Sequence, residues 1–313
     1  MSNLPDWARA LGPTLFAATI RSTPDDFIVT EQLEIDFSGD GEHDWLYVEK
    51  IGANTHWVTE QLARHAGINA RDVGFAGLKD RHAVTEQWFS VRRPSAAGTD
   101  WLSFEAEGVR IIEQRLHNRK LKRGAHRGNR FRIALRSVGL AQHADPIAQR
   151  LAKIEKGGVP NYFGEQRFGR NGANIELGHA VVAGRRVARH KRSIGISALR
   201  SLDFNNSLDE RVREGTWNRI LPGDVANLDG SRSVFAVDEI TPELERRCTE
   251  MDIHPTAVLP AIEKVGVEAA SRPMRMRLGD LKWTLENDVL WLEFELPKGA
   301  FATTVLRELA VLQ

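Results

Sequence analysis

Along the N-terminal half of the chain, hydrophobic and polar positions alternate with the period of two that β-strands require. The alternating runs are bounded by polar turns and lie at Phe27–Thr30, Trp45–Glu49, Ala83–Val91, Val109–Leu116 and Asn129–Leu135. Two other stretches carry apolar residues at helical spacing and predict helices over Trp57–Ala66 and Pro146–Ile154. Gly67 directly follows the first of these and is expected to cap it, because glycine adopts the left-handed backbone easily.

The pattern changes after Lys156–Pro160, where glycine and proline interrupt it. The middle of the chain predicts a helix over Glu176–His190 and polar strand-like runs around Asp224–Val237. Strand periodicity returns at Met274–Leu281, Trp283–Leu285 and Leu290–Glu295, and a helix is expected over Thr303–Val311. Strand-rich material at both ends around a different middle predicts an inserted domain of about 120 residues.

Composition supports a globular protein of two domains. The 313 residues are 42% hydrophobic and 27% charged, which is ordinary for a chain that buries a large core. The single cysteine, Cys248, excludes an intramolecular disulfide and a zinc site made of thiolates. No signal-peptide pattern opens the chain, and no apolar run approaches the ~20 residues that span a bilayer. We therefore expect a cytoplasmic protein without a membrane segment.

The positive charges are concentrated, although the net charge is only +1. Nine lysines and arginines and no acid occur between Arg115 and Arg136. A second acid-free cluster runs from Arg185 to Arg192. Basic faces on a nearly neutral body favour a polyanionic partner such as nucleic acid.

The loop Gly77–Gln87 carries the first candidate for chemistry. Asp80 lies between Lys79 and Arg81, and neighbouring cations keep a carboxylate ionised. An ionised, positioned carboxylate is a usable nucleophile. Gln87 lies two residues beyond Thr85 on the following strand, so both point to one face and predict a pocket floor. A charged loop and a polar stripe that only face water would show the same pattern.

Three further segments combine glycines, aromatic residues and arginines. In Arg123–Leu135 a basic loop leads into a strand, where Phe131 either stacks on a base or belongs to the core. Val159–Arg170 fits a recognition loop or a hinge between domains. In Pro297–Glu308, Phe301 lies near the start of the expected helix and Arg307 nearly two turns further on, where it could simply pair with its neighbours.

Other chemistries are disfavoured. The ten histidines are scattered without metal-ligand spacing, so no metal site is expected. The chain lacks a phosphate-binding loop, a Gly-x-Ser-x-Gly nucleophile elbow and a dinucleotide fingerprint. No cofactor is therefore expected.

Five strings together resemble the TruD family of tRNA pseudouridine synthases, in the order of that family and from about residue 20 to 310. They are Pro24–Glu31, Gly77–Gln87, Gly128–Phe131, Asn161–Gly169 and Gly299–Glu308. The segments Asn205–Leu208 and Leu221–Asp224 resemble parts of the TRUD domain that this family carries as an insertion. Arg21 stands where the family often has lysine.

The resemblance implies an α+β fold. Residues 1–154 and 276–313 would form a catalytic domain, a mixed and mainly antiparallel sheet with flanking helices. Residues 155–275 would form the inserted α/β TRUD domain. Transfer RNA would lie in a basic cleft between the two domains, and no protein partner would be required.

The resemblance also implies the reaction, which converts uridine to pseudouridine, in bacterial members at position 13 of the D arm. Asp80 matches the catalytic aspartate, and Arg307 matches the basic residue that pairs with it in related synthases. Phe27, Asn129 and Phe301 match positions that line the active site. We add Phe131, Lys79 and Gln87 as substrate-binding candidates.

Two alternatives stay open. A non-catalytic protein that binds transfer RNA and assists its folding would use the same basic surface. A metal-free hydrolase built on Asp80 is weaker, because no partnered second acid or base stands near Asp80 in the sequence.

Overall fold

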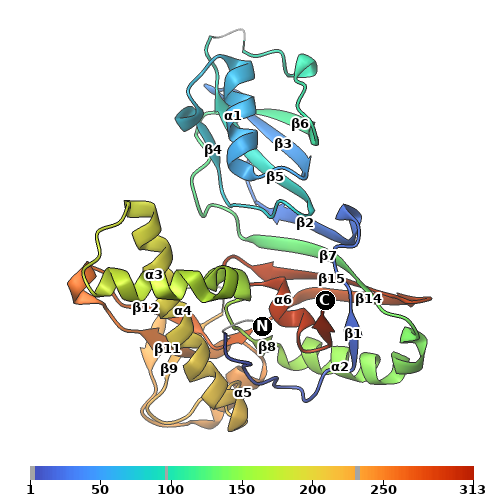
Figure 1. Ribbon diagram of the computed structural model, residues 1–313, viewed down its shortest axis with the longest axis vertical. Coiled ribbons are helices and arrows are strands. Elements are labelled where there is room, and N and C mark those ends of the chain that lie inside the picture. The colour runs from blue at the N-terminus through green and yellow to red at the C-terminus, as the bar shows by residue number, and fades with distance from the viewer. Residues whose placement is uncertain (1–3, 96–97, 230–232) are drawn as a thin grey trace. The chain divides into compact units, whose positions relative to one another are not determined.

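The computed structural model describes residues 4–95, 98–229 and 233–313 (Figure 1). The chain forms two compact units. The sheet unit comprises residues 17–144, 279–299 and 312–313, and the helix-rich unit comprises residues 1–16, 145–278 and 300–311. These boundaries differ from those expected for a catalytic and an inserted domain, because both chain ends contribute to the unit that contains the middle stretch. The assignment of catalysis and of an insertion to particular residues stays a prediction.

In the part of the sheet unit that the structure describes, eight strands form one sheet in the order β14-β15-β7-β2-β5-β3-β6, with β4 beside β5. All neighbouring strands are antiparallel except β2 and β5. The strands are β2 (Phe27–Gln32), β3 (His43–Ile51), β4 (Val73–Phe75), β5 (Val84–Arg92), β6 (Val109–His117), β7 (Gly128–Arg136), β14 (Gly279–Glu286) and β15 (Val289–Pro297). The predicted mixed, mainly antiparallel sheet is confirmed.

Helix α1 (Thr55–Ala66) covers one face of this sheet, as Figure 1 shows for strands β3 and β5. Its apolar side chains, including Val58 and Leu62, pack on Leu46 and Phe89. The helix begins at the N-cap Asn54 and ends where Gly67 takes a left-handed conformation, with φ of 66°. The predicted helix and its glycine cap are confirmed.

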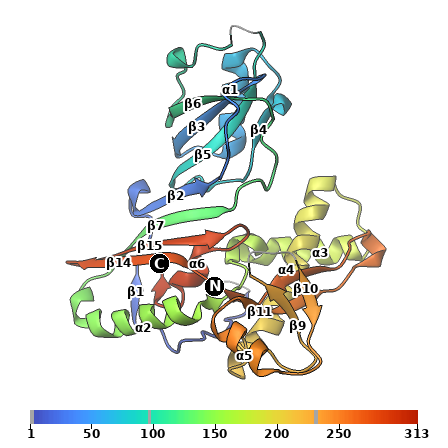
Figure 2. The same ribbon diagram turned by 180° about the vertical axis from the view of Figure 1, so that it is seen from behind.

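The helix-rich unit contains a four-stranded antiparallel sheet in the order β10-β9-β11-β12 (Figure 2). Its core gathers Trp7, Tyr162, Phe168, Phe204 and Leu208. The helices are α2 (Ala144–Gly157), α3 (Ala173–Val182), α4 (Arg189–Arg213), α5 (Pro242–Thr249) and α6 (Ala302–Leu306). The strands are β8 (Val159–Pro160), β9 (Val225–Leu228), β10 (Val234–Ala236), β11 (Ile253–Leu259), β12 (Ala270–Pro273) and β13 (Arg275–Met276); two more, β1 (Phe16–Ala18) and β16 (Ala310–Leu312), lie where the chain passes between units.

Two predicted helices are corrected. The helix expected over Glu176–His190 is two helices, because Gly184 takes a positive φ of 99° and the chain turns between α3 and α4. Glycine is the residue that tolerates such a turn. The helix expected over Thr303–Val311 ends at Leu306, and residues 310–312 form a strand. A short apolar segment satisfies either periodicity, so tertiary contacts decide its structure.

Within the residues that the structure describes, no helix combines the length and the apolar character needed to cross a membrane.

Candidate active site

Strand register places four of the predicted site residues on one face of the sheet unit. On β2 and β7 the facing pairs are Phe27 with Ile133 and Val29 with Phe131, so Asn129 and Phe131 share the face of Phe27. The parallel pairing of Val29 with Thr85 adds Gln87, which lies two residues beyond Thr85 on β5. Side chains two apart in a strand point the same way, and these segments, separated along the chain, therefore build one surface.

Asp80 lies in the loop between β4 and β5, and its side chain is 40% exposed. Its Oδ2 accepts a hydrogen bond from Nη2 of Arg21 at 2.9 Å. The guanidinium of Arg21 also lies over the ring of Phe27, 4.2 Å from its centroid. Arg21 has a positive φ of 59°, which is uncommon for a residue with a side chain. The contacts of Arg21 thus hold a cation beside an accessible carboxylate.

Lys50 is a residue that the sequence analysis missed. It is fully buried on β3, and its Nζ donates to the backbone oxygen of Asp80 at 2.9 Å and to that of Ala53 at 2.8 Å. Burial lowers the pKa of Lys50 to about 8. The sequence could have indicated this burial. Lys50 lies two residues beyond Val48 and four beyond Leu46, so it points to the same apolar face of the strand. A lysine on that face needs a buried partner.

Lys79 does not reach outward, as a contact with the RNA backbone would require. It is buried, its Nζ donates to Oε2 of Glu31 at 2.7 Å, and its backbone N–H donates to the hydroxyl of Thr55. Burial raises the pKa of the Glu31 carboxyl, while Lys79 opposes that shift. This pair fixes the beginning of the Asp80 loop, and a direct contact between Lys79 and substrate stays a prediction.

Gln87 holds the same loop from the strand side. Its Nε2 donates to the backbone oxygen of Gly77 at 3.1 Å, and its Oε1 accepts from the hydroxyl of Thr55 at 3.2 Å. The side chain is fully buried. Gln87 therefore positions the Asp80 loop in this structure, and a direct contact between Gln87 and substrate stays a prediction.

The aromatic residues of this face are packed together. Phe27 and Phe131 meet edge to face with their centroids 6.2 Å apart, and Phe131 stacks on Phe294 at 5.7 Å. Both Phe27 and Phe131 are buried. Asn129 is half-buried at the start of β7, and its buried Oδ1 has no hydrogen-bond partner in the described part of the chain. The described residues thus leave the hydrogen-bonding capacity of this buried amide oxygen unused.

The helix-rich unit holds the other two aromatic motifs. Phe163 and Phe301 meet with centroids 5.9 Å apart, and Gly164 allows this approach, because a Cβ there would touch the Phe301 ring. The side-chain amide of Asn205 accepts from the backbone N–H of Phe163 at 2.8 Å and donates to its carbonyl oxygen at 3.0 Å. The Asn161–Gly169 and Gly299–Glu308 strings are thus joined in one packed structure.

Arg307 is anchored in the helix-rich unit. Its guanidinium donates to the backbone oxygens of Trp7 and Ala8 and lies 4.9 Å from the centroid of the Tyr162 ring. Burial lowers the pKa of Arg307. The cation found paired with Asp80 is Arg21, and the pairing of Arg307 with Asp80 stays a prediction.

The basic run from Arg115 to Arg136, expected to form a basic face, is partly neutralised by acids in the structure. Acids pair with five of its nine cations: Arg115 with Glu113 of its own strand, and Arg127, Arg130, Arg132 and Arg136 with acids on other segments. Arg123 lies over the ring of Phe75, 3.6 Å from its centroid. Arg119 and Lys122 remain exposed and form no ion pair with any described residue. The positive surface offered to a polyanion is therefore smaller than the sequence indicates.

Among the described side chains, no three or more of His, Cys, Asp and Glu gather in a way that could hold a metal ion. The chemistry that this face offers is that of a carboxylate beside a cation, next to an aromatic cluster and an unsatisfied amide oxygen.

Comparison with known proteins identifies the group to which this arrangement belongs. The family profile of tRNA pseudouridine synthase D (TruD) matches residues 14–187 and 259–309, which is more than half of the chain. The chain belongs to the TruD family. It is therefore a pseudouridine synthase, an enzyme of the isomerase class, and the resemblance drawn from the sequence is confirmed.

Bacterial members of the TruD family are similar over almost the whole chain. A tRNA pseudouridine synthase D of Methylococcus capsulatus is 41% identical, with 97% of this chain and 94% of the relative covered. One from Aeromonas salmonicida is 42% identical, with 93% and 90% covered. A crystal structure of a TruD candidate from Methanosarcina mazei superimposes with a TM-score of 0.74 at 19% identity, covering 98% of this chain and 95% of that one. This last likeness supports the fold.

Proposed function

We propose that this chain isomerises uridine to pseudouridine in transfer RNA, at position 13 of the D arm, with Asp80 as the reacting carboxylate. The names of its TruD relatives support the substrate class. The observation that carries the role of Asp80 is its accessible carboxylate, held 2.9 Å from Arg21 beside the aromatic face. The D-arm position rests on the sequence resemblance.

The reaction exchanges one bond to the sugar for another. The C1′–N1 bond breaks, a C1′–C5 bond forms, one proton leaves C5 and one joins N1. No electron is gained or lost. Asp80 would either attack C1′ and displace the base, or remove the C2′ proton and leave a glycal to which the base adds. The base must first leave its stack, at a cost of a few kcal/mol.

The neighbouring residues fit this chemistry. The Arg21 guanidinium holds the carboxylate in place through its hydrogen bond, and such an ion pair strengthens when the substrate excludes water. Because Phe27 is buried beneath Arg21, it acts on the site through Arg21. The free Oδ1 of Asn129 can accept the N3–H of a uracil ring. Roles for Phe301 and Arg307 rest on the sequence resemblance.

The test is Asp80→Asn, which keeps the shape of the side chain and removes its charge. Pseudouridine would be measured in an unmodified transfer RNA with uridine at position 13 and in the same RNA with cytidine there. We expect activity to fall by about 10³-fold or more, as it does when other enzymes lose a reacting group. Asp25→Asn is the control, because Asp25 is an exposed acid of the same unit. Unchanged turnover in Asp80→Asn would refute the role of Asp80.

The same experiment addresses the non-catalytic alternative. If the chain were only a folding aid for transfer RNA, neither the parent protein nor Asp80→Asn would form pseudouridine. The variant would assist RNA folding as well as the parent. Binding of transfer RNA by the variant should match that of the parent protein, since Asp80 is not a phosphate contact. If pseudouridine formed at a site other than position 13, the chain would still be shown to be a pseudouridine synthase. Only the D-arm assignment would then be overturned.

A further inference from the structure

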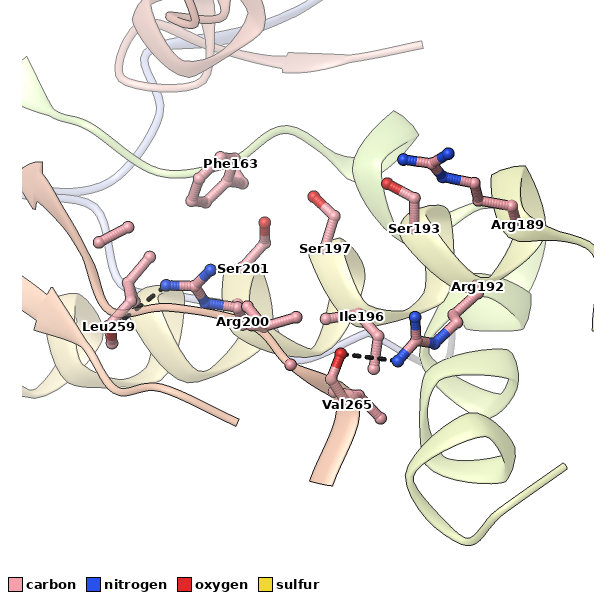
Figure 3. Close-up of a pocket in the computed structure, with 13 residues that line it drawn as sticks. Phe163, Arg189, Arg192, Ser193, Ile196, Ser197, Arg200, Ser201, Leu259 and Val265 are labelled. Atoms are coloured by element: carbon pink, nitrogen blue, oxygen red, sulfur yellow. Dashed lines mark hydrogen bonds between the residues drawn. The ribbon is translucent and has the colours of Figure 1, made fainter. Parts of the chain in front are cut away.

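A pocket of about 360 Å³ lies beside helix α4, within the helix-rich unit (Figure 3). Ser193, Ser197 and Ser201 line it, and they are four residues apart along the helix. Residues at this spacing share one side of a helix. Figure 3 shows their three hydroxyls on the side of α4 that faces Phe163 and the guanidinium of Arg189. The pocket therefore presents a row of hydroxyl groups along one wall and an aromatic ring at one end.

Arginines surround these hydroxyls. Arg189, Arg192 and Arg200 line the pocket, and its lining includes no aspartate or glutamate. Arg192 donates to the carbonyl oxygen of Val265 and Arg200 to that of Leu259, which fixes both guanidinium groups at the pocket wall. The Nε of Arg200 is buried and finds no hydrogen-bond partner among the described residues. A donor buried in this way has capacity left for a ligand.

Two half-buried arginines add positive charge next to this wall. Arg167 donates to the hydroxyl of Ser197 at 3.1 Å and forms no ion pair with any carboxylate in the described ranges. Arg272 lies over the ring of Phe163, 3.9 Å from its centroid. Burial, and secondarily the charge of Arg167, lowers the pKa of Arg272 to about 9. Burying a cation such as Arg167 without a carboxylate partner is costly, and an anion in the pocket would relieve that cost.

The start of helix α4 points to the same class of ligand. The helix begins at Arg189, and its N-cap, Ala188, has no side chain that could accept from the free amides of the first turn. The N-terminus of a 25-residue helix carries partial positive charge and binds phosphates well. Arg189 and Ser193 belong to this end of the helix and also line the pocket.

We propose that this pocket binds a phosphate group of the RNA substrate, held by the serine hydroxyls and the arginines of α4. The proposal rests on the proposed function, because that function supplies the RNA. Arginine and serine are common phosphate contacts, and an aromatic ring such as Phe163 can support a base or sugar next to the bound phosphate. A free phosphate or mononucleotide offers the same chemistry, so the experiment must separate these sources from RNA.

The test compares two serines of the same helix. Ser193→Asp places a carboxylate in the pocket, whereas Ser207→Asp makes the same change at an exposed position of α4 outside the pocket. Both positions are exposed, so both variants should fold. We expect Ser193→Asp to weaken transfer RNA binding about tenfold and to reduce the slope of log affinity against log salt by roughly one, as the loss of one phosphate contact does. Ser207→Asp should change affinity less than about twofold.

A second pair of variants removes charge instead of adding it. Arg189→Gln should weaken binding more than Arg186→Gln, since both arginines are exposed but only Arg189 lines the pocket. Equal effects within each pair would overturn the proposal. Titration of inorganic phosphate and uridine monophosphate into the parent protein and Ser193→Asp separates the sources. If Ser193→Asp lost affinity for these small anions but kept its affinity for transfer RNA, the RNA assignment would be overturned.

Steady-state kinetics separate this proposal from the proposed function. Ser193→Asp should raise KM about tenfold, because the loss of a uniform binding contact appears in KM. Asp80→Asn should lose kcat and keep its binding. If Ser193→Asp did not behave as expected but Asp80→Asn did, the phosphate pocket would be overturned and the catalytic role of Asp80 would stand.

Discussion

The ammonium group of Lys50 donates a hydrogen bond to the backbone oxygen of Asp80 at 2.9 Å. The same group donates to the backbone oxygen of Ala53 at 2.8 Å. A buried lysine thus ties the candidate catalytic loop to the end of strand β3. The position of the Asp80 carboxylate depends on a cation that never reaches the surface.

Lys50 should make stability depend on pH in the alkaline range. Burial lowers its pKa to about 8, against 10.5 for an exposed lysine. Between these values the unfolded chain binds a proton that the folded chain has released, so the free energy of unfolding should rise with pH through this window. Below about pH 8 both states carry the proton, and the contribution of Lys50 should be flat. Urea unfolding at several pH values measures this effect.

In Lys50→Met the rise between about pH 8 and pH 10.5 should be smaller than in the parent protein. Lys122→Met is the control, because Lys122 is exposed in the same unit and should keep the parental slope. Identical slopes in all three proteins would show that Lys50 does not titrate in this range. The Lys50 variant should also lose turnover, by roughly 10-fold or more, since the Asp80 loop loses its hydrogen bond from the Lys50 ammonium group.

The buried pair of Lys79 and Glu31 should contribute strongly to stability when one partner is removed. Lys79→Met would leave the Glu31 carboxylate buried without its cation, and such a change typically costs about 3–5 kcal/mol of unfolding free energy. Replacing both residues, as Lys79→Met with Glu31→Leu, should recover much of that loss, because an apolar pair needs no charge partner. Urea denaturation of the single and double variants measures both effects.

The exposed pair of Arg127 and Glu34 provides the control for this measurement. Arg127→Met should cost less than about 1 kcal/mol, since water screens exposed pairs. If Lys79→Met cost no more than Arg127→Met, the Lys79 pair would not hold the loop as described.

Asn129→Ala should separate activity from stability. The Oδ1 of Asn129 has no partner in the described chain, so its removal should change the unfolding free energy by less than about 0.5 kcal/mol. A lost hydrogen bond to substrate should lower kcat/KM roughly 10–100-fold. Steady-state kinetics and thermal unfolding of the same preparation give both quantities. An exposed asparagine, Asn118, changed to alanine should affect neither. A large loss of stability in Asn129→Ala would mean that the residue supports the fold instead.

The sequence predicted the local structure where its signals were local. Alternation located strand β5, and Gly67 located the end of helix α1, because each depends on residues next to one another. It failed where tertiary contacts decide. The acids that neutralise Arg130 and Arg132 lie on β14 and β15, about 150 residues away along the chain. A reading of charge along the chain cannot include them.

The candidate site shows the same division. Family strings located Asp80 and Asn129, and the strand register then placed Asn129, Phe131 and Phe27 on one face. The partner of Asp80 could not be derived in this way, since Arg21 reaches it only through the folding of the sheet unit. The burial of Lys79 could not be predicted either. A lysine in a polar loop is expected to be exposed, but in the structure Lys79 is buried.

The C-terminal strands of the chain have a consequence for the order of synthesis. Strand β15 pairs along β7 over its full length, and residues 300–311 belong to the helix-rich unit. Neither compact unit is therefore complete until residues 279–311 have been synthesised. Pairing between such distant segments is slow, and the unfinished strand edges expose surfaces prone to aggregation. Folding of both units should thus wait for this segment, and deletion of residues 289–311 should impair both units together.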